Sequence, residues 1–110
     1  MIVGIGIDVF YFEQAQNLLA EDYSPFLKPS EQAKLQQSHC VQTLAGILAL
    51  KEAAFKALPK QEINFWDLEI RWTDHDKPFC EFEDYRILLS LSYGKDCALA
   101  IALCLDEATP

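Results

Sequence analysis

The sequence predicts an α+β fold in which one long helix packs across a mostly antiparallel sheet. Residues 41–58 form a nearly continuous apolar stretch, typical of a buried helix, that stops before Pro59. One strand-like stretch precedes this helix and four follow it, and a short Gly-Lys-Asp turn joins the last two as in a hairpin. The chain has 110 residues, 51% of them hydrophobic, which is enough for a single domain over residues 1–110.

The N-terminal part is expected to be a strand followed by helices. Residues 1–8, MIVGIGID, mix apolar residues with glycines, which favours a strand that another group approaches closely. Asp8 is expected at or just beyond the end of this strand. The next helix has four apolar residues on one face: Phe12, Ala15, Leu18 and Leu19. Residues 21–30 are expected to form a loop, and Ser30 is the predicted N-cap of a short helix over residues 31–37.

The C-terminal part is expected to be mainly sheet. Residues 63–73 alternate in polarity, with Leu68, Ile70 and Trp72 on the apolar face of a predicted strand. The remaining expected elements are a turn at 74–78, a strand at 79–83, a strand at 86–93, a turn at 94–96, a strand at 97–105 and a frayed tail. The two long strands are so apolar that we expect a largely buried hairpin.

The composition excludes several classes of function. With 17 acidic and 9 basic residues the net charge is −8, which disfavours binding to nucleic acid or to an anionic membrane surface. No apolar run is long enough to span a bilayer, and no charged leader opens the chain. Four cysteines occur without a CxxC pair, so we expect free thiols, no zinc site and a cytoplasmic protein.

Three charged residues lie inside the apolar helix segment LALKEAAFKAL: Lys51, Glu52 and Lys56. In the simplest interpretation Glu52 and Lys56 form an exposed i,i+4 ion pair, worth about 0.3–0.5 kcal/mol, and Lys51 reaches solvent along its stem. Asp8 would then only cap the following helix. In the alternative, Asp8 and Glu52 share a hard cation such as Mg²⁺, and Lys56 contacts a phosphate bound to it. Spacing alone leaves both interpretations open.

Three motifs in this order resemble the holo-acyl-carrier-protein synthases, the short 4′-phosphopantetheinyl transferases: GIGIDV, LALKEAAFKAL and LLSLSYGKDCALAIAL. The turn DHDKPF also resembles the Gly-Lys-Pro turn of that family, with Asp76 where glycine is usual. The matches span nearly the whole chain. The resemblance implies an enzyme that transfers the 4′-phosphopantetheine group of coenzyme A to a serine of an acyl or peptidyl carrier protein, in fatty acid or polyketide biosynthesis.

The resemblance also implies roles for individual residues. Asp8 and Glu52 match the family's Mg²⁺ ligands, and Lys56 matches the lysine near the pyrophosphate, so Glu52 and Lys56 are the candidate catalytic residues. The candidate contacts to coenzyme A are Lys51, Lys56, Ser92, Tyr93 and Lys95. From the sequence pattern alone, Tyr93 is a hairpin residue and Lys95 an exposed turn lysine. Members of the short class form trimers with each active site between two subunits, so a homotrimer is expected.

The chain departs from the family pattern where cations are usual. Gln42, Gly46 and Ile47 occupy positions that usually carry basic residues, and Tyr93 replaces a histidine. Tyr11 stands where an acid is common, and the helix usually found before residue 86 is missing. Fewer cations weaken contacts to phosphates, and a charge of −8 repels an acidic carrier. Two other hypotheses therefore stay open: a non-catalytic binding or scaffolding module, and an acidic subunit that completes a shared site with a basic homologue.

Overall fold

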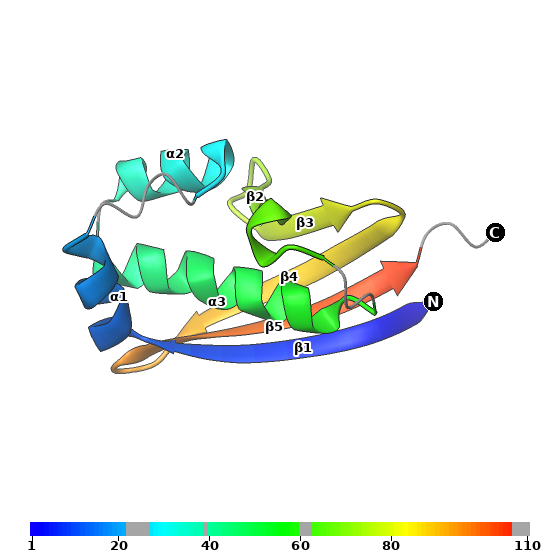
Figure 1. Ribbon diagram of the computed structural model, residues 1–110, viewed down its shortest axis with the longest axis horizontal. Coiled ribbons are helices and arrows are strands. Elements are labelled where there is room, and N and C mark those ends of the chain that lie inside the picture. The colour runs from blue at the N-terminus through cyan, green and yellow to red at the C-terminus, as the bar shows by residue number, and fades with distance from the viewer. Residues whose placement is uncertain (22–26, 39, 60–62, 107–110) are drawn as a thin grey trace.

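In the computed structural model, which describes residues 1–21, 27–38, 40–59 and 63–106, one long helix crosses a five-stranded sheet (Figure 1). The elements are β1 (Ile2–Tyr11), α1 (Phe12–Leu19), α2 (Pro29–Gln37), α3 (Val41–Ala57), the 3₁₀ helix η2 (Phe65–Asp67), β2 (Arg71–Trp72), β3 (Pro78–Phe82), β4 (Tyr85–Tyr93) and β5 (Cys97–Asp106). The strand order is β1-β5-β4-β3-β2 and every pairing is antiparallel. The predicted α+β fold is confirmed. Within the described ranges, no helix has both the length and the apolar character needed to cross a membrane.

Helix α3 is the centre of the core and agrees with its prediction to within one residue. It packs on β1, β5 and β4, while α1 and α2 lie against it, so its side chains are buried from Leu44 to Lys51 (Figure 1). Leu58 is already extended, with ψ 135°, because Pro59 disfavours a helical conformation of the residue before it.

Two glycines of β1 let the helix backbone approach the strand, as their presence in an apolar strand predicts. A Cβ atom at Gly4 would lie 1.8 Å from the Ala57 carbonyl oxygen, and one at Gly6 would lie 2.0 Å from that of Ala53. No side chain fits in this space, so only glycine allows this packing. The close contact between β1 and α3 holds Asp8 beside the helix.

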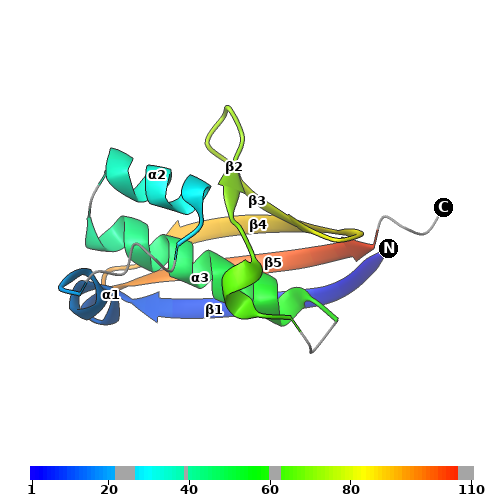
Figure 2. The same cartoon turned by 45° about the horizontal axis from the view of Figure 1, so that its top comes forward.

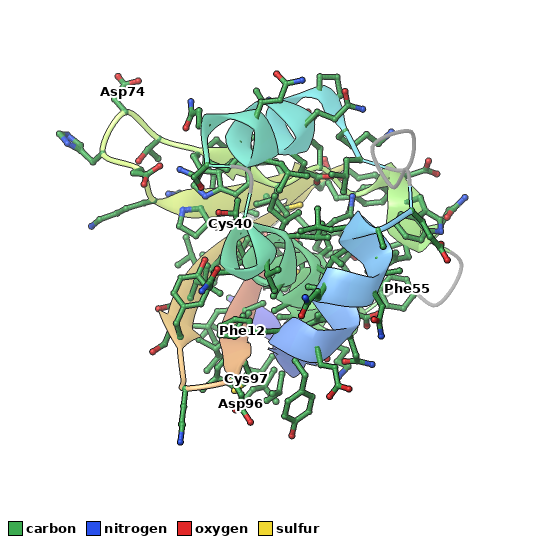
Figure 3. All side chains as sticks on the ribbon, turned by 90° about the vertical axis from the view of Figure 1, so that its left-hand side faces the viewer. Phe12, Cys40, Phe55, Asp74, Asp96 and Cys97 are labelled. Carbon is green, nitrogen blue, oxygen red and sulfur yellow. The ribbon has the colours of Figure 1, made fainter. Side chains whose placement is uncertain are left out.

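Strand β1 is longer than expected, and Asp8 lies inside it rather than at its end. Asp8 pairs with Ala100 of β5, and the pairing continues to Tyr11 and Cys97. Tyr11 occupies the N-cap position of α1, so the prediction that Asp8 caps this helix is wrong. The strand continues because β5 offers partners along its whole length, and Phe12 N then donates to Asp96 O at 2.9 Å. Figure 3 shows Phe12, Asp96 and Cys97 together where α1 begins.

The predicted strand over residues 63–73 is wrong for most of its length. Only β2 forms, preceded by η2, where the Asn64 side chain accepts a hydrogen bond from Trp66 N. The alternation did identify the buried side chains, since Leu68 and Ile70 are fully buried. No ladder forms there because charged side chains bind the backbone instead: Leu68 O accepts from a lysine and Ile70 N donates to a glutamate, both described below.

Helix α2 begins earlier than predicted. Pro29 is its first residue, a position where the missing N–H costs nothing, and Ser30 lies inside the first turn rather than at the N-cap. The Ser30 hydroxyl instead lies 2.6 Å from Ile70 O and 2.8 Å from Glu69 Oε2. Half of the loop predicted over residues 21–30, namely residues 22–26, falls outside the described residues.

The hairpin of β4 and β5 is buried on one face only, which corrects the expectation of a largely buried pair. All helices cover the same side of the sheet (Figures 1 and 2). The opposite side, here called the open face, exposes large apolar residues: Ile5, Ile7, Val9, Leu88, Leu99 and Ile101. Strand β5 also includes Asp106, which was expected in the tail, and residues 107–110 lie outside the described chain.

Two turns explain departures from the family pattern. Phe82 pairs directly with Tyr85, so β3 and β4 form a tight hairpin. Within the described range 63–106, no helix lies between these two strands, as the short segment before residue 86 predicts. Asp76, in the turn between β2 and β3, has φ 64°, the left-handed region where glycine is favoured and aspartate is tolerated. Figure 2 shows this turn projecting away from α3.

Candidate active site

Asp8, Glu52 and Lys56 meet where β1 runs beside α3. Lys56 Nζ donates hydrogen bonds to Asp8 Oδ1 at 3.1 Å and to Ile7 O at 3.2 Å. Glu52 lies one helical turn before Lys56, and it is near enough to Asp8 for the two carboxylates to interact electrostatically. Side chains more than 40 residues apart in the sequence, from β1 and from α3, therefore form one cluster. Lys56 therefore forms its ion pair with a carboxylate of β1, a contact that the i,i+4 interpretation did not include.

The two carboxylates of this cluster are suited to a hard cation. Burial raises the pKa of Glu52, the charge of Asp8 raises it further, and Lys56 partly offsets both effects. No third His, Cys, Asp or Glu joins them among the described residues. Mg²⁺ prefers a few carboxylate oxygens and fills its other positions with water and substrate phosphates, so the donor set fits this ion. The half-exposed Lys56 side chain shows that the cluster faces solvent.

Replacing Glu52 by glutamine is expected to raise the melting temperature of the metal-free protein at pH 7–8. The raised pKa means that the folded protein holds the Glu52 proton more tightly than the unfolded chain does. Ionised Glu52 therefore destabilises the fold above its folded pKa, and this penalty vanishes below the ordinary carboxyl pKa. Thermal unfolding of both proteins in EDTA from pH 3.5 to 8 measures the difference. An equal difference at all pH values would contradict the expectation, and exposed Glu13→Gln is the control.

Lys51 is not in this cluster, and the prediction that it contacts coenzyme A is wrong for this geometry. Its side chain is fully buried. Its ammonium lies 2.9 and 3.1 Å from the two carboxylate oxygens of Glu31 and donates to Leu68 O at 2.7 Å. No role was predicted for Glu31. A buried lysine requires a buried acceptor, but nothing in the sequence indicates which of 17 acids supplies it.

Ser92, Tyr93 and Lys95 lie at the far end of β4 and are not brought to Asp8 in the same chain. Asp8 pairs with Ala100, which pairs with Leu91, so two strand spacings of together about 10 Å separate β1 from β4. Side chains alternate along β4, so Tyr93 faces the helix side and Ser92 the open face. These three candidates can complete the cluster only if another copy of the chain presents them.

Two departures from the family pattern compensate each other in space. A Cβ atom at Gly46 would lie 2.7 Å from the Tyr93 hydroxyl, so the tyrosine occupies room that any larger residue at position 46 would need. The ring of Phe12 lies 6.3 Å from that of Tyr93. Burial raises the pKa of Tyr93, which keeps the phenol neutral and able to donate a hydrogen bond.

An open groove of about 460 Å³ adjoins Tyr93 and carries cations that the sequence analysis did not single out. Lys34 and Lys77 line it together with Trp72, Pro78 and Tyr93. The Lys34 ammonium lies 5.3 Å from the centre of the Trp72 ring and pairs with Asp76. The groove thus holds two lysines, of which Lys34 lies over an aromatic ring, together with the acid Asp76. Cations and aromatic rings suit a ligand with both phosphates and a planar ring.

Comparison with known proteins identifies the family to which this chain belongs. Residues 4–104 match the family model of the 4′-phosphopantetheinyl transferase superfamily, and the chain belongs to this superfamily. The curated relatives include holo-(acyl-carrier-protein) synthases. That of Geobacillus sp. (strain WCH70) is 32% identical over 111 residues, with 91% of this chain and 93% of the relative covered. That of Bacillus cereus (strain AH187) is 34% identical over 110 residues, covering 91% and 92%.

Solved structures agree with this assignment. The holo-(acyl-carrier-protein) synthase of Bacillus anthracis str. Ames, in complex with CoA (3′,5′-ADP), superposes with a TM-score of 0.80 at 31% identity, over 94% of this chain and 96% of that one. The enzyme of Neisseria meningitidis gives 0.79 at 26% identity, over 96% and 99%. The recognition made from three sequence motifs is confirmed: the chain belongs to the 4′-phosphopantetheinyl transferase superfamily and is similar to its holo-(acyl-carrier-protein) synthases.

Proposed function

We propose that this protein transfers the 4′-phosphopantetheine group from coenzyme A to a serine of an acyl or peptidyl carrier protein, in a Mg²⁺-dependent reaction. The observation that carries the proposal is the meeting of Asp8, Glu52 and Lys56 between β1 and α3. Membership of the superfamily and the similarity to an enzyme solved with CoA support the substrate.

Each residue of the cluster has a task in this reaction. The serine Oγ forms a bond to the β-phosphorus of coenzyme A, the P–O bond to the α-phosphate breaks, and adenosine 3′,5′-bisphosphate leaves. Mg²⁺ held by Asp8 and Glu52 would offset the charge on the pyrophosphate. Lys56 is fixed by Asp8 where its ammonium can contact the same oxygens. Glu52 lies in the same cluster and is the candidate to accept the serine proton.

A direct assay tests this function. The protein, Mg²⁺ and coenzyme A are mixed with apo-carrier proteins, including those encoded in the same genome, and the carriers are weighed by mass spectrometry. The proposal expects a mass gain of one phosphopantetheine group that EDTA prevents. The absence of this gain on every carrier would refute it.

We further propose that the protein is a cytoplasmic homotrimer whose active sites lie between subunits. Two findings support this: the open face is rich in exposed apolar side chains, and Tyr93 and Lys95 are separated from Asp8 within one chain. A neighbouring subunit would bring its own groove, with Lys34 and Lys77, towards the cluster. These lysines would then replace the cations missing at positions 42, 46 and 47.

Placing a charge on the open face is expected to dissociate the oligomer. Ile101 is 45% exposed at the middle of β5, and an aspartate there would be buried without a partner in any assembly through this face. Light scattering of Ile101→Asp should give the mass of one chain, with transfer activity lost along with the shared sites. Gln16→Asp, on the exposed side of α1, is the control and should keep the wild-type mass. An unchanged mass for Ile101→Asp would contradict assembly through the open face.

A non-catalytic binding module is the second candidate, favoured by the net charge of −8. Calorimetry with coenzyme A separates the two. Tight binding that requires Mg²⁺, together with modification of a carrier, supports the enzyme. Binding of coenzyme A with no carrier modified supports the module.

A further inference from the structure

Lys51 and Glu31 form a fully buried ion pair in which both carboxylate oxygens of Glu31 accept hydrogen bonds. Both side chains have an exposed fraction of 0%. Glu31 Oε1 accepts from Lys51 Nζ and from Lys28 N, each at 2.9 Å. Glu31 Oε2 accepts from Lys51 Nζ at 3.1 Å and from Ile70 N at 2.7 Å. These hydrogen bonds fix the positions of both side chains, and breaking a buried ion pair is costly because it leaves a charge without a partner.

This ion pair fastens three separate segments to one point. Glu31 comes from the first turn of α2, Lys51 from the middle of α3, and the segment between η2 and β2 contributes Leu68 O and Ile70 N. The rings of Phe65 and Trp66 lie 5.8 and 5.9 Å from the ammonium. Helix α3 is thereby tied to α2 and to the segment that precedes β2.

The buried part of the packing between α3 and β1, two elements described in full, involves no large side chains, and the polar contacts across it are those of the half-exposed Lys56 with Asp8 and Ile7 O. The residues that meet there are small: Ala53 and Ala57 on the helix and Gly4 and Gly6 on the strand. Small residues interlock less than large ones, so contacts on the other sides of α3 also bear on its rotation about its axis. Yet this is the surface that carries Asp8 on one side and Glu52 on the other.

We propose that the Lys51–Glu31 pair sets the rotation of α3 about its axis and so places Glu52 and Lys56 opposite Asp8. Lys51 and Glu31 are then positioning residues, and this role rests on the proposed function. Lys51 and Glu52 are consecutive, so a rotation that loosens one moves the other. A rotation of about 20° moves a Cα atom by about 0.8 Å and the carboxylate further. Mg²⁺ requires nearly ideal octahedral geometry, and a misplacement of about 1 Å reduces a rate by about 10²-fold.

The test uses the double variant Lys51→Met/Glu31→Gln. Methionine fills the space of the lysine stem, and glutamine still offers an oxygen to Ile70 N, so the charges and their direction are removed while volume is kept. Three measurements are made: the melting temperature, the dissociation constant of Mn²⁺ as a probe for the metal site, and the crystal structure. Leu44→Ala, a buried position of the same helix without a polar contact, is the control for lost stability.

The proposal expects the double variant to bind Mn²⁺ at least tenfold more weakly than wild type, with α3 rotated and the Lys56–Asp8 ion pair broken. Leu44→Ala should lower the melting temperature at least as much and keep the Mn²⁺ affinity. An unmoved helix and an affinity within twofold of wild type would overturn the proposal. If the double variant does not fold, Glu31→Gln alone is judged by the same two limits. If wild type binds no Mn²⁺ and modifies no carrier, the proposed function fails, and the crystal structure alone decides the positioning role.

Discussion

Glu52→Gln and Asp8→Asn are each expected to lower kcat/KM for carrier modification by about 10³-fold or more. Both substitutions keep the size of the side chain and remove the charge. Glu52 and Asp8 are the only two carboxylates gathered here within the described part of the chain, so removing one leaves a cation with a single ionic ligand from the protein. Mass spectrometry of an apo-carrier at several Mg²⁺ concentrations measures the loss.

The design separates loss of the site from loss of the fold. Glu52→Gln is expected to be at least as stable as wild type at neutral pH, so its inactivity cannot result from unfolding. Asp8→Asn removes the carboxylate that holds Lys56, so its loss combines the metal ligand with the position of the lysine. Activity within tenfold of wild type in both variants would refute the assignment of the metal site. Glu13→Gln, an exposed acid on α1, should change little.

The sequence predicted those parts of the fold that depend on local pattern. A nearly continuous apolar stretch and Pro59 defined α3 to within one residue, and the glycines of β1 indicated the close approach of another group. The prediction failed at residues 63–73, where alternation identified the buried side chains but not the absence of a ladder. Pairing there is decided by Glu31 and Lys51, which are distant in sequence and bind the same backbone groups.

The candidate site was also predictable only in part, because contacts between residues distant in sequence decide its geometry. Asp8, Glu52 and Lys56 were identified because they resemble a family motif, and neither spacing nor composition showed that they meet. Lys51 was assigned to coenzyme A by the resemblance, and the pattern alone predicted that its stem reaches solvent. Both predictions are wrong, because the side chain is fully buried. Its burial depends on a carboxylate from α2, a contact that no local pattern encodes. The face of the sheet left open also depends on where the helices pack, which strand hydrophobicity does not reveal.

Gly6→Ala is expected to destabilise the protein by about 3 kcal/mol or more, because the added methyl has no space to occupy. Its Cβ would lie 2.0 Å from Ala53 O and 2.9 Å from Ala57 N, both backbone atoms of a buried helix. Neither atom can move unless α3 moves as a whole. Chemical denaturation, with the free energy of unfolding extrapolated to water, measures the effect.

Gly94→Ala is the matched control, since its Cβ would lie 3.2 Å from the Cys97 sulfur in an exposed turn, and its change should stay within about 1 kcal/mol. A loss for Gly6→Ala no larger than this would contradict the close packing of β1 on α3. The comparison also bears on catalysis. Asp8 lies two residues after Gly6 in β1, so both face α3. A helix pushed off the strand would separate Asp8 from Glu52 and Lys56. Folded Gly6→Ala protein should therefore show both reduced activity and a weaker response to Mg²⁺, a combination that lost stability alone does not produce.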